Sequence, residues 1–217
     1  MFSKVKYIVV IAGLITLLNA CQKTRVQSFG QYCQWINDPA KGVCKEKFIN
    51  GIQLKLKYMP PAFQVYRELK SMEKYSEEEK NNLTRSYANS LTFVLSLGPD
   101  EREKSAVDIM YKNLSTYKEY AERVNEINFQ MEQFLTLEAG RVEYKPVLTS
   151  MDGVQGLSNT KSIMIVFSPK DANDKNLLSA KQFTLTYDDD MFGLGTNHFI
   201  FYRNDINNIP EFTFWDN

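Results

Sequence analysis

The sequence has few of the residues on which common active sites depend. Its 217 residues include one histidine, His198, and three cysteines, and no glycine-rich phosphate-binding loop occurs. Basic residues number 26 and acidic residues also number 26, so the chain lacks the basic excess that neutralises nucleic-acid phosphates. The missing basic excess argues against nucleic-acid binding. The scarcity of histidine and cysteine leaves few residues for catalysis, and if the protein is an enzyme we expect carboxylate or Ser/Lys chemistry.

The first 20 residues have the organisation of an export signal. Lys4 and Lys6 precede an apolar run over residues 8–18, and the segment contains no acidic residue. A membrane-spanning helix needs about 20 apolar residues, so this run is too short for a comfortable permanent anchor. We therefore expect residues 1–20 to be a signal peptide that is removed.

The motif Leu18-Asn19-Ala20-Cys21 directly follows this run and resembles the lipobox of bacterial lipoproteins. The resemblance implies a thioether-linked diacylglycerol on Cys21, cleavage before Cys21, and acylation of the new amino terminus. Several acyl chains together hold a protein stably at a membrane, whereas one chain is a marginal anchor. The alternative is an ordinary secretory signal with a cysteine at its cleavage site.

The residues after Cys21 bear on the membrane to which the protein is sent. Gln22 stands where aspartate would signal inner-membrane retention in some two-membrane bacteria. The lipoprotein resemblance therefore implies a lipid anchor in the outer membrane. Lys23, Thr24 and Arg25 are not the acidic residues that accompany surface export in some lipoproteins, so we expect a periplasm-facing domain, with surface exposure as the alternative.

Cys33 and Cys44 remain as a pair in an oxidising compartment, where disulfides form and persist. We therefore predict a disulfide between them, closing a turn-rich loop, with a contribution of about 2–3 kcal/mol on the chain-entropy model. A redox pair normally has only two residues between its cysteines. A zinc site would lack ligands because His198 is distant, and we expect no cofactor beyond the lipid on Cys21.

The mature chain shows no Pro/Gly/Ser-rich linker and no repeat. We expect residues 21–32 to be the lipidated cysteine and a polar tether, and residues 33–217 to form one globular domain. Helices are expected after Pro60-Pro61, from the capping box at Ser76, and after Asp100.

Strands are predicted mainly by alternation of apolar and polar residues. Asn50-Gly51 lies between two such segments and predicts a two-residue hairpin turn. The further segments expected to form strands are 91–97, 124–137, 142–148, 163–167 (covered on both faces), 183–187 and 198–202. Short connections favour antiparallel pairing, so the predicted fold is α+β: a β-sandwich or strongly twisted antiparallel sheet with a few helices on one side.

Two C-terminal segments carry candidate functional residues. Asp188, Asp189 and Asp190 are a weak candidate for a calcium-type site, but aspartate is also common in hairpin turns, and we prefer the turn. Phe212, Phe214 and Trp215 are too apolar for a free tail. We expect this tail either to fold back as a final strand or to bind a partner.

No motif assigns a catalytic residue, so the leading hypothesis is a non-enzymatic accessory or structural subunit of an envelope assembly such as a transporter or secretion machine. Its partners would be the bilayer, through acylated Cys21, and an envelope protein. The alternatives are an envelope hydrolase that uses loop carboxylates and a glycan-binding lipoprotein. A flat apolar patch would favour the first, a deep acidic cleft the second, and an open aromatic groove the third.

Overall fold

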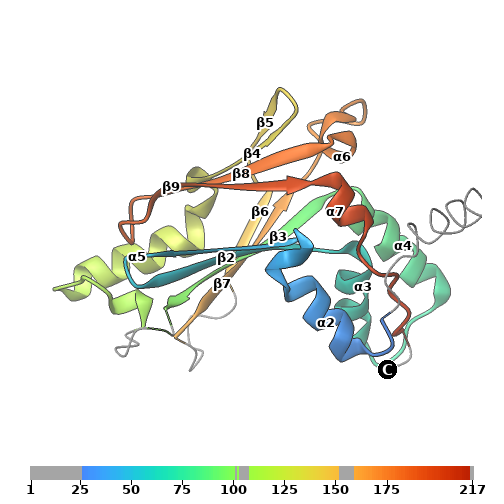
Figure 1. Ribbon diagram of the computed structural model, residues 1–217, viewed down its shortest axis with the longest axis horizontal. Helices are drawn as coiled ribbons and strands as arrows, with labels where there is room; N and C mark the ends of the chain where they lie inside the picture. Colours follow the sequence, from blue (N-terminus) through green and yellow to red (C-terminus); the bar gives the residue numbers. More distant parts are fainter. Residues whose placement is uncertain (1–25, 101, 103–107, 152–158, 216–217) are drawn as a thin grey trace, which may run out of the picture.

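The computed structural model describes residues 26–100, 102, 108–151 and 159–215. The signal segment and Cys21 lie outside the described residues, so their assignment stays a prediction. Within the described part the fold is α+β, as expected, and consists of two antiparallel sheets accompanied by helices (Figure 1).

The five-stranded sheet has the order β1 (Cys44–Ile49), β2 (Ile52–Met59), β3 (Leu91–Pro99), β7 (Lys161–Phe167) and β6 (Leu148–Met151). The four-stranded sheet has the order β5 (Val142–Tyr144), β4 (Leu135–Ala139), β8 (Gln182–Asp189) and β9 (Gly195–Tyr202). The predicted hairpin between β1 and β2 is confirmed. Asn50 and Gly51 have φ values of 52° and 71°, as a primed two-residue turn requires.

The two sheets contact each other through the side chains on one face of each. Phe93 of β3 lies 6.1 Å from Phe183 and 5.1 Å from Phe201, measured between ring centroids. Successive residues of a strand point to opposite faces. The residues that alternate with Phe93 on its strand, such as Thr92 and Val94, therefore lie on the outer face of the five-stranded sheet.

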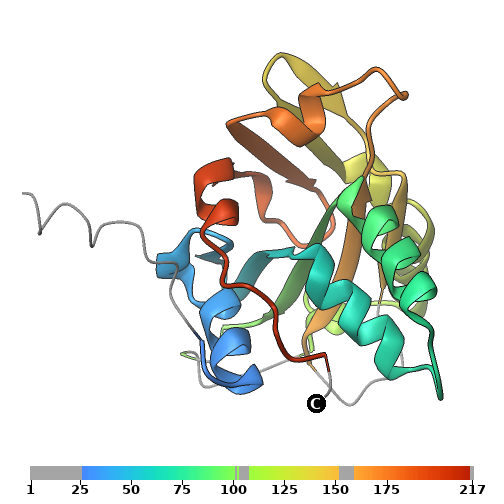
Figure 2. The same cartoon turned by 90° about the vertical axis from the view of Figure 1, so that its right-hand side faces the viewer.

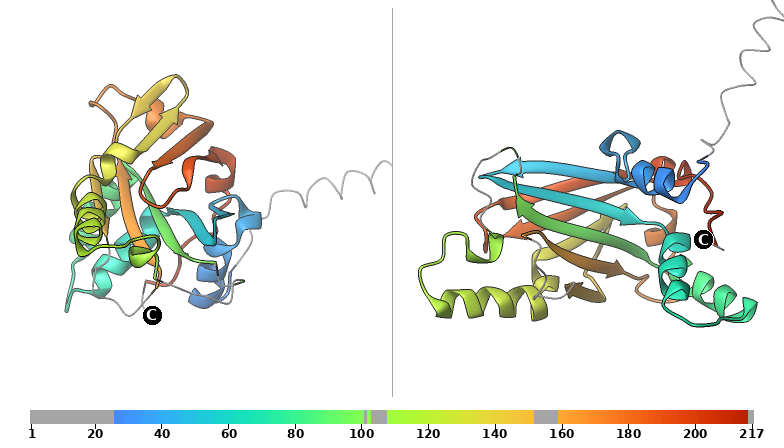
Figure 3. Two further views of the ribbon diagram at one scale, coloured as in Figure 1. Left: turned by 90° about the vertical axis from the view of Figure 1, so that its left-hand side faces the viewer. Right: turned by 90° about the horizontal axis from the view of Figure 1, so that it is seen from below.

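The helices in the described residues are α2 (Phe29–Asn37), α3 (Pro61–Lys70), α4 (Glu77–Ala88), α5 (Tyr117–Phe129), α6 (Asn176–Ser179) and α7 (Arg203–Asn207). Helices α2, α3 and α4 gather at one end of the five-stranded sheet, whereas α5 lies apart from them (Figures 1 and 3). The capping box predicted at Ser76 is confirmed, because the Ser76 hydroxyl accepts a hydrogen bond from the amide of Glu79 and the Glu79 carboxylate accepts one from the amide of Ser76. None of the helices in the described segments is long and apolar enough to cross a membrane.

The strand predicted over 124–137 is wrong for most of its length, because α5 extends to Phe129, a 3-10 turn follows, and β4 begins only at Leu135. The alternation was misleading because Ile127 and Met131 are four residues apart, a spacing that also places them on one face of a helix. Both are buried, whereas Phe129 between them is 73% exposed. The capping box of Thr116 and Glu119 starts the helix.

Two further expectations need correction, and a third lies largely outside the described residues. The helix expected after Asp100 falls mostly on residues 101 and 103–107, which the structure does not describe, and the described residues just after them form a 3-10 turn, Ile109–Tyr111. Leu148 does not share a strand with Val142, because β5 ends at Tyr144, before Pro146, and Leu148 begins β6, which belongs to the other sheet. Strand β7 is not covered on both faces: its outward Met164 is only half-buried.

The segment around Cys33 also differs from its prediction. Helix α2 begins at Phe29, inside the expected tether, and it buries Tyr32, Trp35 and Ile36 in the core. The predicted disulfide is not formed in the structure, where Cys33 and Cys44 are free thiols. The loop that the bridge was expected to close is stabilised instead by the packing of α2, and burial raises the pKa of both thiols.

Candidate functional site

The C-terminal tail packs inside this chain. Phe212 and Phe214 are 6% and 7% exposed and lie in an irregular segment that runs between α2 and α3 (Figure 2). The Phe212 ring lies 5.1 Å from the rings of both Tyr32 and Tyr66. Trp215 is half-buried, and its ring lies 5.0 Å from that of Phe212. The tail therefore folds back, but not as a strand, and its buried phenylalanines do not form a surface for a partner.

The three consecutive aspartates have separate roles. Asp189 is buried, and its carboxylate accepts hydrogen bonds from the Tyr187 hydroxyl at 2.6 Å and the Leu194 amide at 2.7 Å. It thereby organises the turn between β8 and β9, in agreement with the preferred turn interpretation. Asp188 accepts a hydrogen bond from Thr196, and Asp190 is exposed. Among the described residues, no group of three or more His, Cys, Asp or Glu side chains is arranged to hold a metal ion.

His198 lies on the outer, exposed face of β9, where its Nδ1 is 2.9 Å from the Thr186 hydroxyl. A cross-strand hydrogen bond of this kind is a sufficient structural role for it.

Arg123 is a buried residue for which the sequence analysis found no role. It is 6% exposed, and its guanidinium donates hydrogen bonds to the carbonyl oxygens of Ile109 (3.0 Å), Lys112 (2.8 Å) and Met191 (2.8 Å). The guanidinium also lies over the Phe192 ring at 4.7 Å. Arg123 therefore fastens α5 both to the preceding 3-10 turn and to the turn between β8 and β9.

Three tyrosines form what we call the tyrosine surface: Tyr111 in the 3-10 turn before α5, and Tyr117 and Tyr120 in its first turn. The rings of Tyr111 and Tyr120 are stacked, with centroids 4.9 Å apart and planes 6° apart, and Tyr117 lies 6.2 Å from Tyr120. Tyr111 is 58% exposed and Tyr117 is 83% exposed. The hydrogen bond with Tyr111 raises the pKa of Tyr120. The tyrosine surface is thus ordered by its own contacts, while the Tyr111 and Tyr117 rings remain exposed to water.

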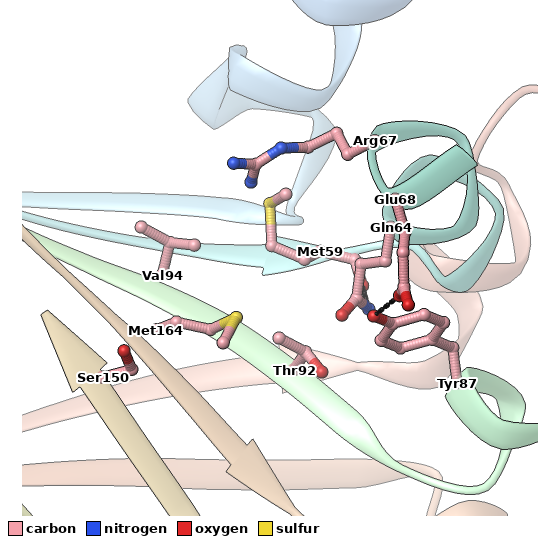
Figure 4. Close-up of a pocket in the computed structure, with 9 residues that line it drawn as sticks. All are labelled: Met59, Gln64, Arg67, Glu68, Tyr87, Thr92, Val94, Ser150 and Met164. Carbon is pink, nitrogen blue, oxygen red and sulfur yellow. Dashed lines mark hydrogen bonds between the residues drawn. The ribbon is translucent and has the colours of Figure 1, made fainter. Parts of the chain in front are cut away.

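A second candidate site lies on the outer face of the five-stranded sheet. Cross-strand pairing places Met59 beside Thr92, and Val94 beside Met164, on this face. These residues line a cavity of about 320 Å³ beside α3 and α4, which we call the sheet pocket (Figure 4). The volume is at the lower end of the range of about 300–1,000 Å³ that is typical of small-molecule sites.

The sheet pocket contains polar side chains as well as apolar ones. Thr92 is 2% exposed, and within the described part of the chain its hydroxyl has no hydrogen-bond partner. Gln64 donates a hydrogen bond to the Met59 carbonyl oxygen at 3.0 Å, and Tyr87 donates one to the Glu68 carboxylate. Burial, together with this hydrogen bond, raises the pKa of Tyr87 to about 12. A buried hydroxyl without a partner is uncommon, because its desolvation is uncompensated.

The side of the sheet pocket towards β1 is basic. Arg67 is exposed and extends over Met59, away from Glu68 (Figure 4). Lys57 lies next to Met59 on the same face of β2, and its ammonium group donates a hydrogen bond to Asn37 at 2.9 Å. Burial lowers the pKa of Lys57, and the charges of Lys55 and Arg67 lower it further. Lys55 and Lys57 also line a neighbouring cavity of about 260 Å³.

None of the sheet-pocket residues was singled out from the sequence as a functional residue. The available signal was Thr92, a polar residue between Leu91 and Phe93 in an apolar strand. Arg67, Glu68 and Tyr87 carry no such signal, because charged residues and tyrosines are ordinary on the surfaces of helices.

No protein-family model matches the sequence, and no curated protein matches it. Among solved structures, a protein of unknown function from Burkholderia pseudomallei is similar, with 12% sequence identity and a TM-score of 0.36. The similarity covers 78% of this chain and 83% of that one.

Proposed function

We propose that the protein is a lipid-anchored, non-enzymatic accessory subunit of an envelope assembly. In this proposal acylated Cys21 holds it at the outer membrane, and the domain faces the periplasm. The anchor and the location rest on the lipobox-like motif alone. The structure bears on the other half of the proposal, namely how the domain would contact a protein partner.

The observation that carries the partner contact is the tyrosine surface. Helix α5 and the 3-10 turn before it lie at the end of the molecule remote from α4 (Figure 3). Tyr111 of that turn and Tyr117 of α5 are 58% and 83% exposed. Tyrosine is enriched at protein interfaces and among the residues that dominate binding energy. The stacking of Tyr111 on Tyr120 and the fastening of α5 by Arg123 hold the rings before any partner arrives. A surface ordered in advance loses less conformational entropy on binding.

The geometry favours binding over the hydrolase alternative. Hydrolysis by carboxylates requires two carboxyl groups that face one another across a cleft. Among its lining residues the sheet pocket has one carboxylate, Glu68, which already accepts a hydrogen bond from Tyr87. The carboxylate of Asp189 is committed to the turn between β8 and β9.

The test is site-specific photocrosslinking in the cells that make the protein. A benzoylphenylalanine replacing Tyr117 should give a discrete crosslinked envelope protein. The matched control is the same replacement at Tyr202, which is 46% exposed on the outer face of the four-stranded sheet, and we expect no discrete product there. Crosslinks of equal yield at both positions, or none at position 117, would contradict the proposed contact.

Two further measurements separate the parts of the proposal. Mass spectrometry of the mature protein should find lipid on Cys21. A Cys21 without lipid would refute the proposed membrane anchor. Binding to peptidoglycan that is lost in Tyr117→Ala would favour the glycan-binding alternative over the accessory subunit.

A further inference from the structure

Two opposite charges border the sheet pocket without neutralising each other. Arg67 and Glu68 are neighbours in α3, and adjacent residues of a helix do not face one another. Figure 4 shows the Arg67 guanidinium reaching over Met59, while the Glu68 carboxylate turns towards Tyr87. Within the described residues, neither side chain forms a salt bridge with another residue. The pocket thus presents a positive group on one side and a negative group on the other.

The floor between these charges is apolar and adaptable. Met59 of β2, Val94 of β3 and Met164 of β7 all line this part of the pocket, and Val94 and Met164 are cross-strand partners. Methionine has an unbranched, flexible side chain that adjusts to ligands of different shape. Such a floor suits an aliphatic side chain and does not require one particular shape.

Thr92 adds an independent sign of a ligand. Its side chain lines the pocket and is 2% exposed, yet its hydroxyl has no hydrogen-bond partner among the residues that the structure describes. Leaving a buried hydroxyl unpaired costs stability that a valine of the same shape would not cost. A bound polar group that pairs with the hydroxyl would remove this cost.

We propose that the sheet pocket binds a short zwitterionic peptide with apolar side chains, whose carboxylate lies at Arg67 and whose ammonium group lies at Glu68. The apolar side chains lie on Met59, Val94 and Met164, and a polar backbone group of the peptide pairs with the Thr92 hydroxyl. The cavity of about 320 Å³ limits the ligand to one or two residues. This proposal does not rest on the proposed accessory function.

The charge pattern distinguishes this ligand from a simple anionic amphiphile. A fatty carboxylate would satisfy Arg67 but would bring nothing to pair with Glu68. Both ends of the ligand must therefore be tested separately.

The experiment uses the detergent-solubilised full chain and the dipeptide leucyl-leucine, with binding measured by isothermal titration calorimetry. Two modified probes remove one charge each: N-acetyl-leucyl-leucine lacks the ammonium group, and leucyl-leucinamide lacks the carboxylate. We expect saturable binding of the dipeptide and at least about tenfold weaker binding of each modified probe, equivalent to about 1.4 kcal/mol. Dodecanoate binding as tightly as the dipeptide would overturn the proposal in favour of an amphiphile site.

Variants of the protein should mirror the modified probes. Arg67→Gln should weaken binding of leucyl-leucine about tenfold and leave leucyl-leucinamide unaffected. Glu68→Gln can still accept the Tyr87 hydrogen bond. It should weaken binding of leucyl-leucine and leave binding of N-acetyl-leucyl-leucine unaffected. The controls Arg141→Gln and Glu138→Gln change exposed charges on the four-stranded sheet and its turn, and they should alter nothing. Equal effects on all probes would contradict the assigned orientation.

Thr92→Val supplies a readout that does not depend on charge. Without ligand, the variant should unfold at a temperature equal to or above that of the natural protein, because it removes an unpaired buried hydroxyl. It should nevertheless bind the dipeptide several-fold more weakly. The control Thr184→Val lies on the outer face of β8 and should leave binding unchanged. Unaltered affinity in Thr92→Val would show that the hydroxyl does not contact the ligand and would overturn that part of the proposal.

Discussion

Two aromatic regions of the molecule are built in opposite ways. The first, the tail cluster, consists of Phe29, Tyr32, Tyr66, Phe212 and Phe214, which come from three distant parts of the chain. The second is the tyrosine surface, whose three members lie within ten residues of one another. In the tail cluster the rings cover one another on several sides, whereas in the tyrosine surface they stack and leave their outer sides in water.

The difference shows that aromatic content does not by itself indicate a binding surface. Aromatic rings drawn from α2, α3 and the tail bury apolar area that contributes to stability, at about 25 cal/mol per Å². The tyrosines of α5 have hydroxyl groups that keep their exposed rings compatible with water. Stability is therefore expected to depend on the first region and binding on the second.

The largest effect should come from the tail cluster. Phe212→Ala removes a buried ring and leaves a cavity, so the free energy of unfolding should fall by about 3–5 kcal/mol. Tyr117→Ala, the matched change in the tyrosine surface, should stay within about 0.5 kcal/mol of the natural protein. Urea denaturation of both variants checks the comparison. Equal losses in the two variants would remove the distinction between the regions.

Arg123→Met should have the next largest effect, because it leaves the carbonyl oxygens of Ile109, Lys112 and Met191 without their buried donor. We expect a loss of about 1–3 kcal/mol. Amide exchange should quicken in α5 and leave the tail cluster unchanged. Arg141→Met, at an exposed turn, is the control and should change neither quantity. Faster exchange in the tail cluster would mean that the two regions are coupled.

Thr116→Ala removes the hydroxyl that accepts a hydrogen bond from the Glu119 amide at the start of α5. A loss of about 0.5–2 kcal/mol is expected, with faster amide exchange around the tyrosine surface. Ser76→Ala makes the same change in α4, whose Lys80 contacts Trp215. The two variants should therefore loosen different regions, and an identical exchange pattern would show that the capping boxes do not act locally.

Lys80→Gln tests a weaker contact of the tail. The Lys80 ammonium group lies 4.7 Å from the centre of the Trp215 ring, and a cation–π contact of this kind is worth about 0.5–1 kcal/mol at exposed sites. Lys74→Gln is the control, since Lys74 is exposed before α4. Unfolding free energies that do not differ between the two variants would mean that the contact contributes nothing measurable.

The smallest effect concerns pH. Hydrogen bonds from the backbone amides of Ser115 and Thr116 lower the pKa of Glu119 in the folded protein. Its stabilising contribution is therefore present above its unfolded pKa of about 4.3 and is lost as the pH falls through the lower folded value. Acidification should loosen α5, and Glu119→Gln should remove this dependence while Glu122→Gln retains it. The measurement is amide exchange in α5 between pH 6 and pH 3 for the natural protein and both variants. The same pH dependence in Glu119→Gln as in the natural protein would contradict the prediction.

Features with a local cause were predictable. The hairpin at Asn50-Gly51, the capping box at Ser76 and the alternation of Phe183, Leu185 and Tyr187 all appear as expected. Each depends on residues within a few positions of one another. The segment with Ile127 and Met131 was predicted as a strand because strand and helix periodicity both place these two residues on one face. The exposure of Phe129 between them agrees with the helix and not with the strand.

The candidate sites were much less predictable. The turn role of Asp189 follows from its position, but the burial of Phe212 depends on α2 and α3, which lie well over a hundred residues away. The sheet pocket combines Glu68, Thr92 and Met164 from separate elements, and of these only Thr92 stands out in the sequence, as a polar residue in an apolar strand. Helix α2 has the same origin, because Tyr32 and Trp35 pack in the core and the helix takes up part of the expected tether and the start of the expected loop.

The sequence by itself therefore determined the two-residue turn between β1 and β2, the starts of α3 and α4, and strands such as β8, and it predicts the export and lipid-attachment motif. These follow from backbone conformation, side-chain-to-backbone hydrogen bonds and the period of apolar residues, all of which act over a few positions. Only the tertiary structure decided which strand faces are covered, that Phe212 is buried while Tyr117 is exposed, and that Arg67, Glu68 and Thr92 border one cavity. The physical reason is that burial is settled by the packing of all elements together, so a residue's surroundings depend on segments far from it in the chain.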